Sequence, residues 1–172
     1  AYDKVARANG RGYPGGPKIE RIAKEGNPDA VKFPKAHIEG AQYDFSFSGL
    51  KSAVLNYING CKMKGESFDP ADIAASFQKA VVEVLVENSM RAAEDYGMYK
   101  FAIAGGVASN TALRAAMDKA CKEREISFCH PSPIYCTDNA AMVPDRGNVG
   151  HQHGRWSSFD IGGQPGMPVE SG

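Results

Sequence analysis

The sequence lacks the features that identify several classes of protein. No apolar run approaches the roughly 18 residues that a membrane-spanning helix needs, and no signal peptide precedes the first helical pattern. None of the four cysteines forms a CxxC pair, which excludes a zinc knuckle and a CxxC redox motif. Scattered thiols are typical of a reducing compartment, so we expect a cytoplasmic protein with no membrane partner.

Common catalytic signatures are missing as well. The sequence has no G-x-G-x-x-G motif and no P-loop, so generic motif matching identifies no nucleotide site. It has no HExxH motif and no recognisable nucleophile–base pair, so it gives no support to a peptidase. Ala1 opens directly into a helical pattern without an initiating Met, and we therefore expect the chain to be part of a longer protein.

The composition is that of an ordinary soluble globular protein. Of the 172 residues, 42% are hydrophobic and 23% are charged, and the formal net charge is zero. The charge is uneven, because residues 1–64 carry 11 Lys and Arg against 6 Asp and Glu, whereas the remainder is acidic. A basic first third fits one face of an RNA site, although a solvated surface is the commoner reason for such a bias.

The first half of the chain predicts mainly helices. Residues 2–9 form one helix, a glycine-rich break follows, and a second helix begins at Pro17. Residues 43–48 alternate aromatic and polar side chains, which predicts a short strand or extended segment. Ser48 then caps a helix that ends at Gly60. Another helix starts at Asp69 and Pro70 and continues to about Tyr96.

The second half predicts a βαβ order with parallel strands. A short apolar strand over 100–104 leads through Gly105 and Gly106 into a helix that begins after Asn110, and a second strand covers 126–128. A last helix starts at Ala140 and ends early at Pro144. From Gly147 onward the chain is rich in glycine, and we expect a loosely ordered tail over 147–172.

Two places in this pattern are candidates for chemistry. At Gly105, Gly106 and Asn110, backbone amides at the start of a helix could approach an anion, and the Asn110 amide could hydrogen-bond a ribose or a phosphate. A tight turn that needs small residues explains the same pattern equally well. Asp138, just after a strand and at a helix start, could hold a divalent cation, although capping by Asp138 or Asn139 is an equally good explanation.

Together the segments resemble the Kae1/TsaD family, universal proteins once called glycoproteases or O-sialoglycoprotein endopeptidases. The resemblance covers the chain from Ala1 to about Val143. It rests on six stretches in the family's order: 1–6 (AYDKVA), 12–17 (GYPGGP), 44–51 (DFSFSGLK), 74–78 (AASFQ), 104–110 (AGGVASN) and 136–142 (CTDNAAM).

The resemblance implies a helix-rich α/β fold of the actin, Hsp70 and sugar-kinase type, also called ribonuclease H-like, with two lobes around a nucleotide cleft. Residues 1–146 would be the C-terminal lobe, and 147–172 a poorly matched tail. The implied activity is transfer of a threonylcarbamoyl group from threonylcarbamoyl-AMP to N6 of adenosine 37, in tRNAs that read codons starting with A. The implied partners are tRNA, the adenylate or ATP, and accessory proteins of the same pathway.

The same resemblance assigns residues to the nucleotide and to a metal. Those assigned to the nucleotide are Asp3 at the ribose, Gly16 against the nucleoside, Glu20 near the same group, and Gly105, Gly106 and Asn110 at the glycine turn. Asp138 matches a metal-binding aspartate, and the metal is usually iron. Two histidines of an HxxxH motif complete the family's set, which would suit Fe(II), but this chain lacks the motif, so we expect an incomplete site and a chain inactive alone.

Two alternatives remain open from the sequence. A related O-carbamoyltransferase would share the lobe and act on a small molecule. A non-catalytic binding lobe would keep the fold and the partner surfaces without turnover.

Overall fold

A computed structural model describes residues 2–8, 14–35 and 42–156. The chain divides into two compact units, 1–136 and 137–172, which we describe separately. The elements are helices α1 (Tyr2–Ala8), α2 (Gly15–Ala23), α3 (Ser48–Lys64), α4 (Pro70–Asp95), α5 (Thr111–Lys122) and α6 (Met142–Gln152), strands β1 (Lys100–Ala102) and β2 (Ser127–Cys129), and 3-10 turns η1 (Gly106–Ser109) and η2 (Pro133–Tyr135).

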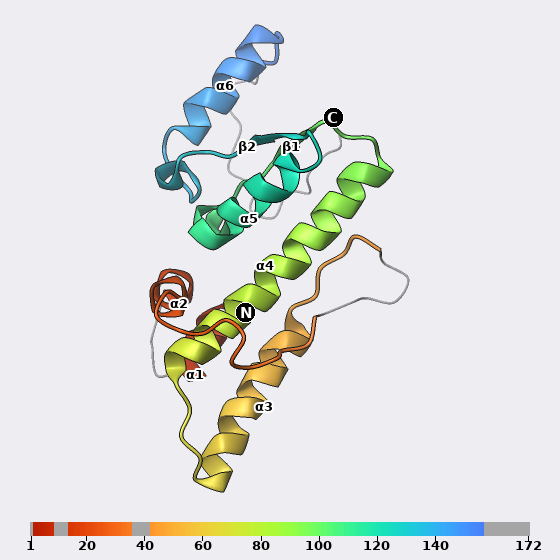
Figure 1. Ribbon diagram of the computed structural model, residues 1–172. Coiled ribbons are helices and arrows are strands. Elements are labelled where there is room, and N and C mark those ends of the chain that lie inside the picture. Colours follow the sequence, from red (N-terminus) through yellow and green to blue (C-terminus); the bar gives the residue numbers. More distant parts are fainter. Residues whose placement is uncertain (1, 9–13, 36–41, 157–172) are drawn as a thin grey trace. The chain divides into compact units, whose positions relative to one another are not determined.

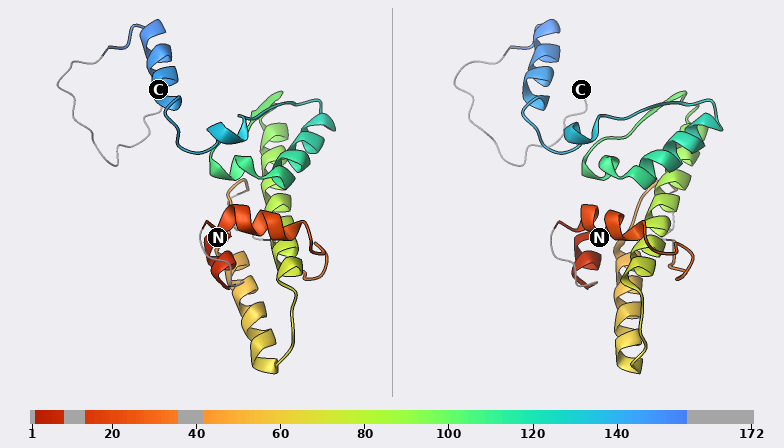
Figure 2. Two further views of the ribbon diagram at one scale, coloured as in Figure 1. Left: turned by 90° about the vertical axis from the view of Figure 1, so that its left-hand side faces the viewer. Right: turned by 60° about the vertical axis from the view of Figure 1, so that its left-hand side comes forward.

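The first unit is organised around α4, the longest helix. Its start agrees with the sequence, because the Asp69 side chain accepts a hydrogen bond from Ala71 N at 2.7 Å and Pro70 opens the first turn. Helices α1 and α2 lie beside the N-terminal half of α4, and α5 lies beside its C-terminal half (Figures 1 and 2). The helix therefore connects two parts of the unit that are far apart in the sequence.

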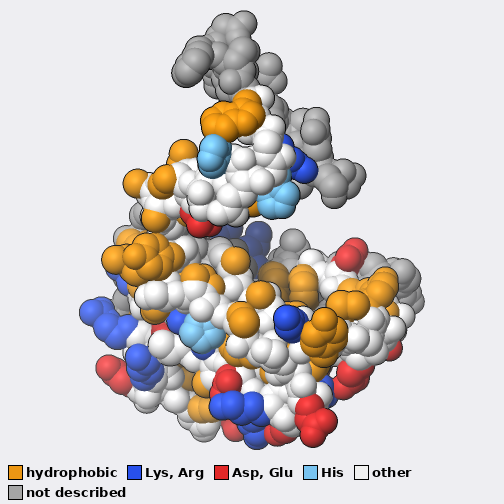
Figure 3. Space-filling model, turned by 90° about the horizontal axis from the view of Figure 1, so that it is seen from above, with side chains coloured by type: hydrophobic (Ala, Val, Ile, Leu, Met, Phe, Trp, Pro, Cys, Tyr) orange, Lys and Arg blue, Asp and Glu red, His pale blue; other side chains and the backbone are white. Residues whose placement is uncertain are grey.

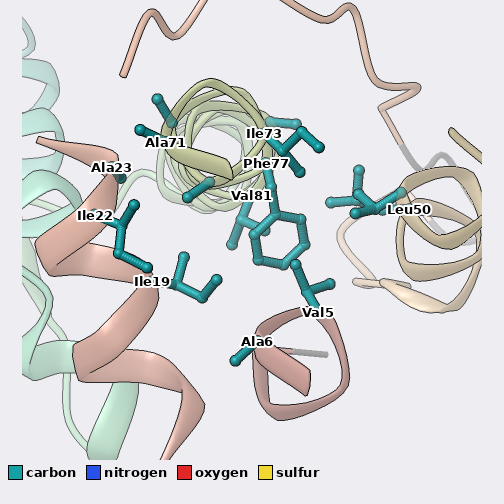
Figure 4. Close-up of a cluster of buried hydrophobic side chains, with 14 of the residues drawn as sticks. Val5, Ala6, Ile19, Ile22, Ala23, Leu50, Ala71, Ile73, Phe77 and Val81 are labelled. Carbon is teal, nitrogen blue, oxygen red and sulfur yellow. The ribbon is translucent and has the colours of Figure 1, made fainter. Parts of the chain in front are cut away.

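Two clusters of buried side chains flank α4. In the first cluster, the fully buried Phe77 points from α4 toward Val5 on α1, with Ile19 of α2 and Leu50 of α3 beside it (Figure 4). The second cluster joins α4 to α5 and the strands through Met90, Leu113, Met117 and Cys121. The buried residues of these helices thus form apolar faces, as amphipathic helices of a globular protein do.

The two strands pair in parallel, as predicted, with α5 as the crossover between them. Their register is Lys100 to Ser127, Phe101 to Phe128 and Ala102 to Cys129. The apolar character of the segment over 100–104 is typical of a buried strand, but β1 is not buried. Only alternate residues, Phe101 and Phe128 among them, pack against α5, and the flanking residues are exposed. Among the described residues the sheet has two strands, so nothing there covers its other face.

Two predicted boundaries in the first half were wrong. Helix α2 begins at Gly15, two residues before Pro17. Helix α3 is not capped by the Ser48 side chain and passes through Gly60 to end at Gly65, whose φ of 69° lies in the left-handed region. Burial of Cys61 just beyond Gly60 favours continuing the helix, which offsets the roughly 1 kcal/mol penalty of an internal glycine.

The segment over 43–48 forms no strand. Its aromatic rings pack instead: Phe45 stacks on Phe47, and the Tyr43 ring meets that of Tyr96. The Tyr43 hydroxyl donates to Asp95 Oδ2 at 2.8 Å, and Asn88 Nδ2 donates to the Asp44 carbonyl at 2.9 Å. The segment is held by side chains of α4, so the alternating pattern reflects packing on a helix.

The second unit contains α6, where the prediction that Pro144 ends the helix was wrong. Pro144 lies in the first turn, where no intrahelical N–H bond is needed, and the helix continues to Gln152. Residues 147–152 of the expected tail are therefore helical, and 157–172 lie outside the described residues. The His151 ring meets Trp156 edge-on.

No helix within the described ranges is long and apolar enough to cross a membrane. Large apolar side chains nevertheless reach solvent around the connection from α4 to β1, at Tyr96, Met98 and Tyr99. Hydrophobic atoms are also visible at the surface in the view from above (Figure 3).

Candidate functional site

The predicted nucleotide residues gather at one cavity of the first unit. The cavity measures about 300 Å³, at the small end of the range for ligand pockets. Its lining residues come from α1, α2 and the turn that leads into α5: Tyr2, Asp3, Gly16, Pro17, Glu20, Gly106, Val107, Ser109 and Asn110. Five of the six predicted nucleotide residues line the cavity. The sixth, Gly105, immediately precedes the lining residue Gly106 in the chain.

Asp3 joins α1 to the start of α2 by a hydrogen bond. Its Oδ1 accepts a hydrogen bond from Gly15 N at 2.7 Å, where a helix has amides without partners inside the helix. The backbones are so close that a Cβ on Gly15 would lie 2.5 Å from the Asp3 Cα. Glycine at 15 is therefore a requirement of packing, and it keeps the Asp3 carboxylate at the cavity.

Glu20 makes the corresponding connection from α2 to α5. Its Oε1 accepts hydrogen bonds from Thr111 N at 2.8 Å and from Thr111 Oγ1 at 2.6 Å. A carboxylate there is favourable because the helix N-terminus carries partial positive charge. Sequence reasoning missed Thr111, since nothing in the pattern links it to a residue 91 positions away.

Asn110 has a structural role that differs from the one expected. It is only 7% exposed. Its Oδ1 accepts from Leu113 N at 2.9 Å and so caps α5, while its Nδ2 donates to Gln78 Oε1 at 2.9 Å. Each end of the amide makes one hydrogen bond within the protein, which leaves one N–H and one lone pair, so its predicted contact with a ribose or phosphate stays a prediction. Sequence reasoning also missed the role of Gln78, although its place in the family-matching stretch 74–78 could have indicated one.

The glycine turn is shaped by Gly105. Its φ of 83° and ψ of 174° form a combination that residues with a side chain rarely adopt. The turn closes on itself, with Ala108 N donating to the Gly105 carbonyl and Asn110 N to the Val107 carbonyl, both at 3.0 Å. Backbone geometry alone thus accounts for glycine at 105, whereas Gly106 lines the cavity.

The charge of the cavity wall limits what it can bind. Among the described residues, the wall carries two carboxylates, Asp3 and Glu20, and no Lys or Arg. Burial, together with the nearby charge of Glu20, raises the pKa of the Tyr2 phenol above its ordinary value, so Tyr2 stays a neutral hydroxyl at physiological pH. The arrangement can accept hydrogen bonds from hydroxyl or amino groups of a ligand, whereas a phosphate against this wall would be repelled.

Asp138 lies in the second unit, in a turn made by its neighbours. Asn139 Nδ2 donates to the Thr137 carbonyl at 2.9 Å, and Asn139 Oδ1 accepts from Ala141 N at 3.1 Å. Asp138 is exposed. Within the described residues no three His, Cys, Asp or Glu side chains are grouped to hold a metal. These donors therefore do not fit a complete metal site, and Asp138 can supply one ligand at most.

Comparison with known proteins identifies the family of the chain. The family model described as TsaD, tRNA N6-adenosine threonylcarbamoyltransferase, matches residues 1–145. Proteins of that name from Clostridium botulinum and Clostridium kluyveri are 53% and 52% identical over 169 and 170 residues. Each alignment covers 98% of this chain and 50% of the relative, so the chain spans about half the length of these curated relatives.

A solved structure extends the comparison to the fold. The crystal structure of T. kodakarensis HypF matches with a TM-score of 0.59 and 26% identity, over 84% of this chain and 18% of that one. The family model covers most of the chain, including both the cavity and Asp138. The chain therefore belongs to the TsaD family of tRNA N6-adenosine threonylcarbamoyltransferases.

Proposed function

We propose that this chain forms the nucleotide-site half of an enzyme that transfers a threonylcarbamoyl group from threonylcarbamoyl-AMP to N6 of adenosine 37, in tRNAs that read codons starting with A. The observation that carries the proposal is the cavity between α1, α2 and η1, where family-matching residues from three separated stretches meet. A tRNA substrate would place the protein in the cytoplasm, together with the accessory proteins of the pathway.

The cavity wall suits the nucleoside part of the adenylate. Asp3 Oδ1 and Glu20 Oε1 are engaged with backbone amides, which fixes both carboxylates and leaves each with a second oxygen. Ribose hydroxyls are donors that such oxygens accept. Gly16 adds a further argument, because a Cβ there would meet nothing within 4 Å. The fold does not demand glycine at 16, whereas a nucleoside in the cavity would.

The proposed reaction needs no nucleophilic side chain from this chain. The adenosine N6 amine attacks the carbamoyl carbon, a C–N bond forms, the bond from that carbon to the phosphate oxygen breaks, and AMP leaves as the amine loses a proton. The contribution of the cavity is to hold the leaving AMP in a fixed orientation, which lowers the entropic part of the barrier.

The proposal includes a divalent metal, Fe(II) by family resemblance, and Asp138 is the one described residue proposed as its ligand. A carboxylate is a suitable ligand for such an ion, which would supply Lewis acidity when bound. One carboxylate is too few, so the remaining ligands would come from outside the described residues. The steps described above do not depend on the metal.

The incomplete sheet supports a two-lobed, actin-like architecture for the whole protein. Two strands with exposed flanking residues seldom form a stable sheet by themselves. The curated relatives are about twice as long as this chain. We infer that the other half of such a protein supplies further strands and the opposite lobe of the cleft.

The experiment that tests the site uses one added methyl group. A chimera in which residues 1–145 replace the matching half of the Clostridium botulinum relative would be assayed for adenosine 37 modification. Gly16→Ala should raise KM for the adenylate by about tenfold or more, since losing the fit of a bound group costs roughly 1–3 kcal/mol. Its thermal stability should not fall, because the methyl meets no protein atom within 4 Å and alanine favours the helix.

The control is Gly60→Ala, which adds the same methyl in α3 where it also meets nothing within 4 Å. It should leave KM unchanged. Equal KM values for Gly16→Ala and the parent chimera would argue against a nucleoside in this cavity. An inactive parent chimera would contradict the proposed activity.

A further inference from the structure

Arg114 makes an unusual set of contacts for a cation. It lies in the first turn of α5 and is half-buried. Its Nε donates to the Ala108 carbonyl at 2.5 Å, and one terminal nitrogen donates to the Pro131 carbonyl at 2.9 Å and to Cys136 Sγ at 3.1 Å. Two of the three acceptors are backbone carbonyls, and the third is a thiol sulfur. In the described part of the chain Arg114 has no carboxylate partner within salt-bridge distance.

The acceptors belong to two segments that are separate in the sequence. Ala108 lies in η1, between Val107 and Ser109, which both line the cavity. Pro131 and Cys136 lie on either side of η2, in the segment that follows β2. Cys136 is 3% exposed, and the chain continues from it directly to Thr137 and Asp138. One side chain thus ties the cavity turn to the segment that leads to the expected metal ligand.

The geometry requires a guanidinium. Its planar fork carries several N–H donors in fixed directions, so a single group can serve acceptors on different sides. A lysine ammonium has the same charge but one nitrogen, and it cannot reach Ala108 and Pro131 as two separate nitrogens do. Arg124, in the turn that follows α5, is a useful contrast, because it pairs with Glu94 through Nε and donates to the Ala120 carbonyl at the end of α5.

We propose that Arg114 is a positioning residue, which couples turn η1 to the segment 131–136 and so holds the cavity wall in one arrangement with that segment. The coupling itself follows from the contacts of Arg114. Its consequence for catalysis rests on the proposed function.

Hydrogen exchange on the 172-residue chain tests the coupling without any assay of activity. Arg114→Lys should speed amide exchange in both 106–109 and 132–136 by about tenfold, because each segment loses the same anchor. The first cluster around α4 should keep its protection. Arg124→Lys, the matched control, should change exchange only near the end of α5. Unchanged exchange in either coupled segment would overturn the proposal.

Kinetics in the chimera test the consequence for the site. Arg114→Lys should lower kcat/KM for the adenylate by about 10- to 100-fold, the range expected for a displaced binding group, while KM for tRNA and the melting temperature stay near those of Arg124→Lys. An equal loss for both substrates would indicate a general structural defect and overturn the positioning role. If the parent chimera were inactive, the proposed function would fail, whereas the exchange experiment would still decide the coupling.

Discussion

The carboxylates at the cavity have two roles: they hydrogen-bond the starts of helices, and they line the cavity wall. Asp3 satisfies an amide at the start of α2, and Glu20 satisfies the amide and hydroxyl of Thr111 at the start of α5. Both acids are also on the cavity wall. The hydrogen bonds that assemble the helices therefore also orient the groups that would meet a ligand, so assembly and binding are coupled at this site.

The contact between Gly15 and Asp3 gives a prediction for stability. A methyl group on Gly15 would lie 2.5 Å from Asp3 Cα, and backbone atoms cannot yield as a flexible side chain can. Gly15→Ala should therefore lower the free energy of unfolding by about 1–3 kcal/mol, as overpacked sites do. Urea denaturation of the chain measures this change.

The matched variant is again Gly60→Ala. It replaces a glycine inside a helix, and the added methyl group meets nothing within 4 Å. It should stabilise the chain by up to about 1 kcal/mol. Both substitutions add one methyl group to a helix glycine. Changes of opposite sign in the free energy of unfolding would therefore be due to the close approach of α1 and α2. A Gly15→Ala chain as stable as the parent would show that the approach is not tight.

At the scale of elements, the starts of α3 and α4 contrast two capping residues. Asp69 bonds Ala71 N, whereas Ser48 makes no capping bond and is itself the first residue of α3. Asp69→Ala should destabilise the chain by about 0.5–2 kcal/mol, the usual loss for an N-cap. Ser48→Ala should change stability by less than about 0.5 kcal/mol. Thermal unfolding of both variants would distinguish them, and equal losses would contradict the assigned caps.

The elements that the sequence predicts well are those with strong local signals. Helix α4 has a cap, a proline and a long apolar face, and the order of β1, α5 and β2 follows from two apolar runs around a glycine turn. The predictions failed where a distant partner decides the outcome. The aromatic segment over 43–48 packs on α4, and α3 passes Gly60 because burial beyond it outweighs local preference.

The same division holds for the candidate site. Family-matching stretches identified Asp3, Gly16 and Gly106, and Glu20 was assigned by its position alone; the fold brings these residues to one cavity. The partners Thr111, Gln78 and Arg114 were missed, because their contacts join positions remote in sequence. The Asn110 amide caps α5, as the sequence pattern allows, and its assignment to a ligand stays a prediction.

At the scale of the whole molecule, the chain offers one wall of a site. The described wall carries two carboxylates and no cation, so the phosphate of an adenylate has no positive partner here. The described residues also include no grouped metal ligands. Under the proposed function, charge neutralisation of the phosphate would come from outside the described lining of the cavity.

This division of charge predicts how the isolated chain binds nucleotides. ATP should bind weakly or not measurably, with a Kd of about 1 mM or above, equivalent to only about 4 kcal/mol of binding free energy, because three phosphates approach a wall of like charge. Adenosine, which lacks the phosphates, should bind no more weakly than ATP. Isothermal titration calorimetry of both ligands measures the difference. A micromolar Kd for ATP would mean that this chain alone supplies the phosphate contacts, and the carboxylate wall would then not be the nucleotide-facing surface.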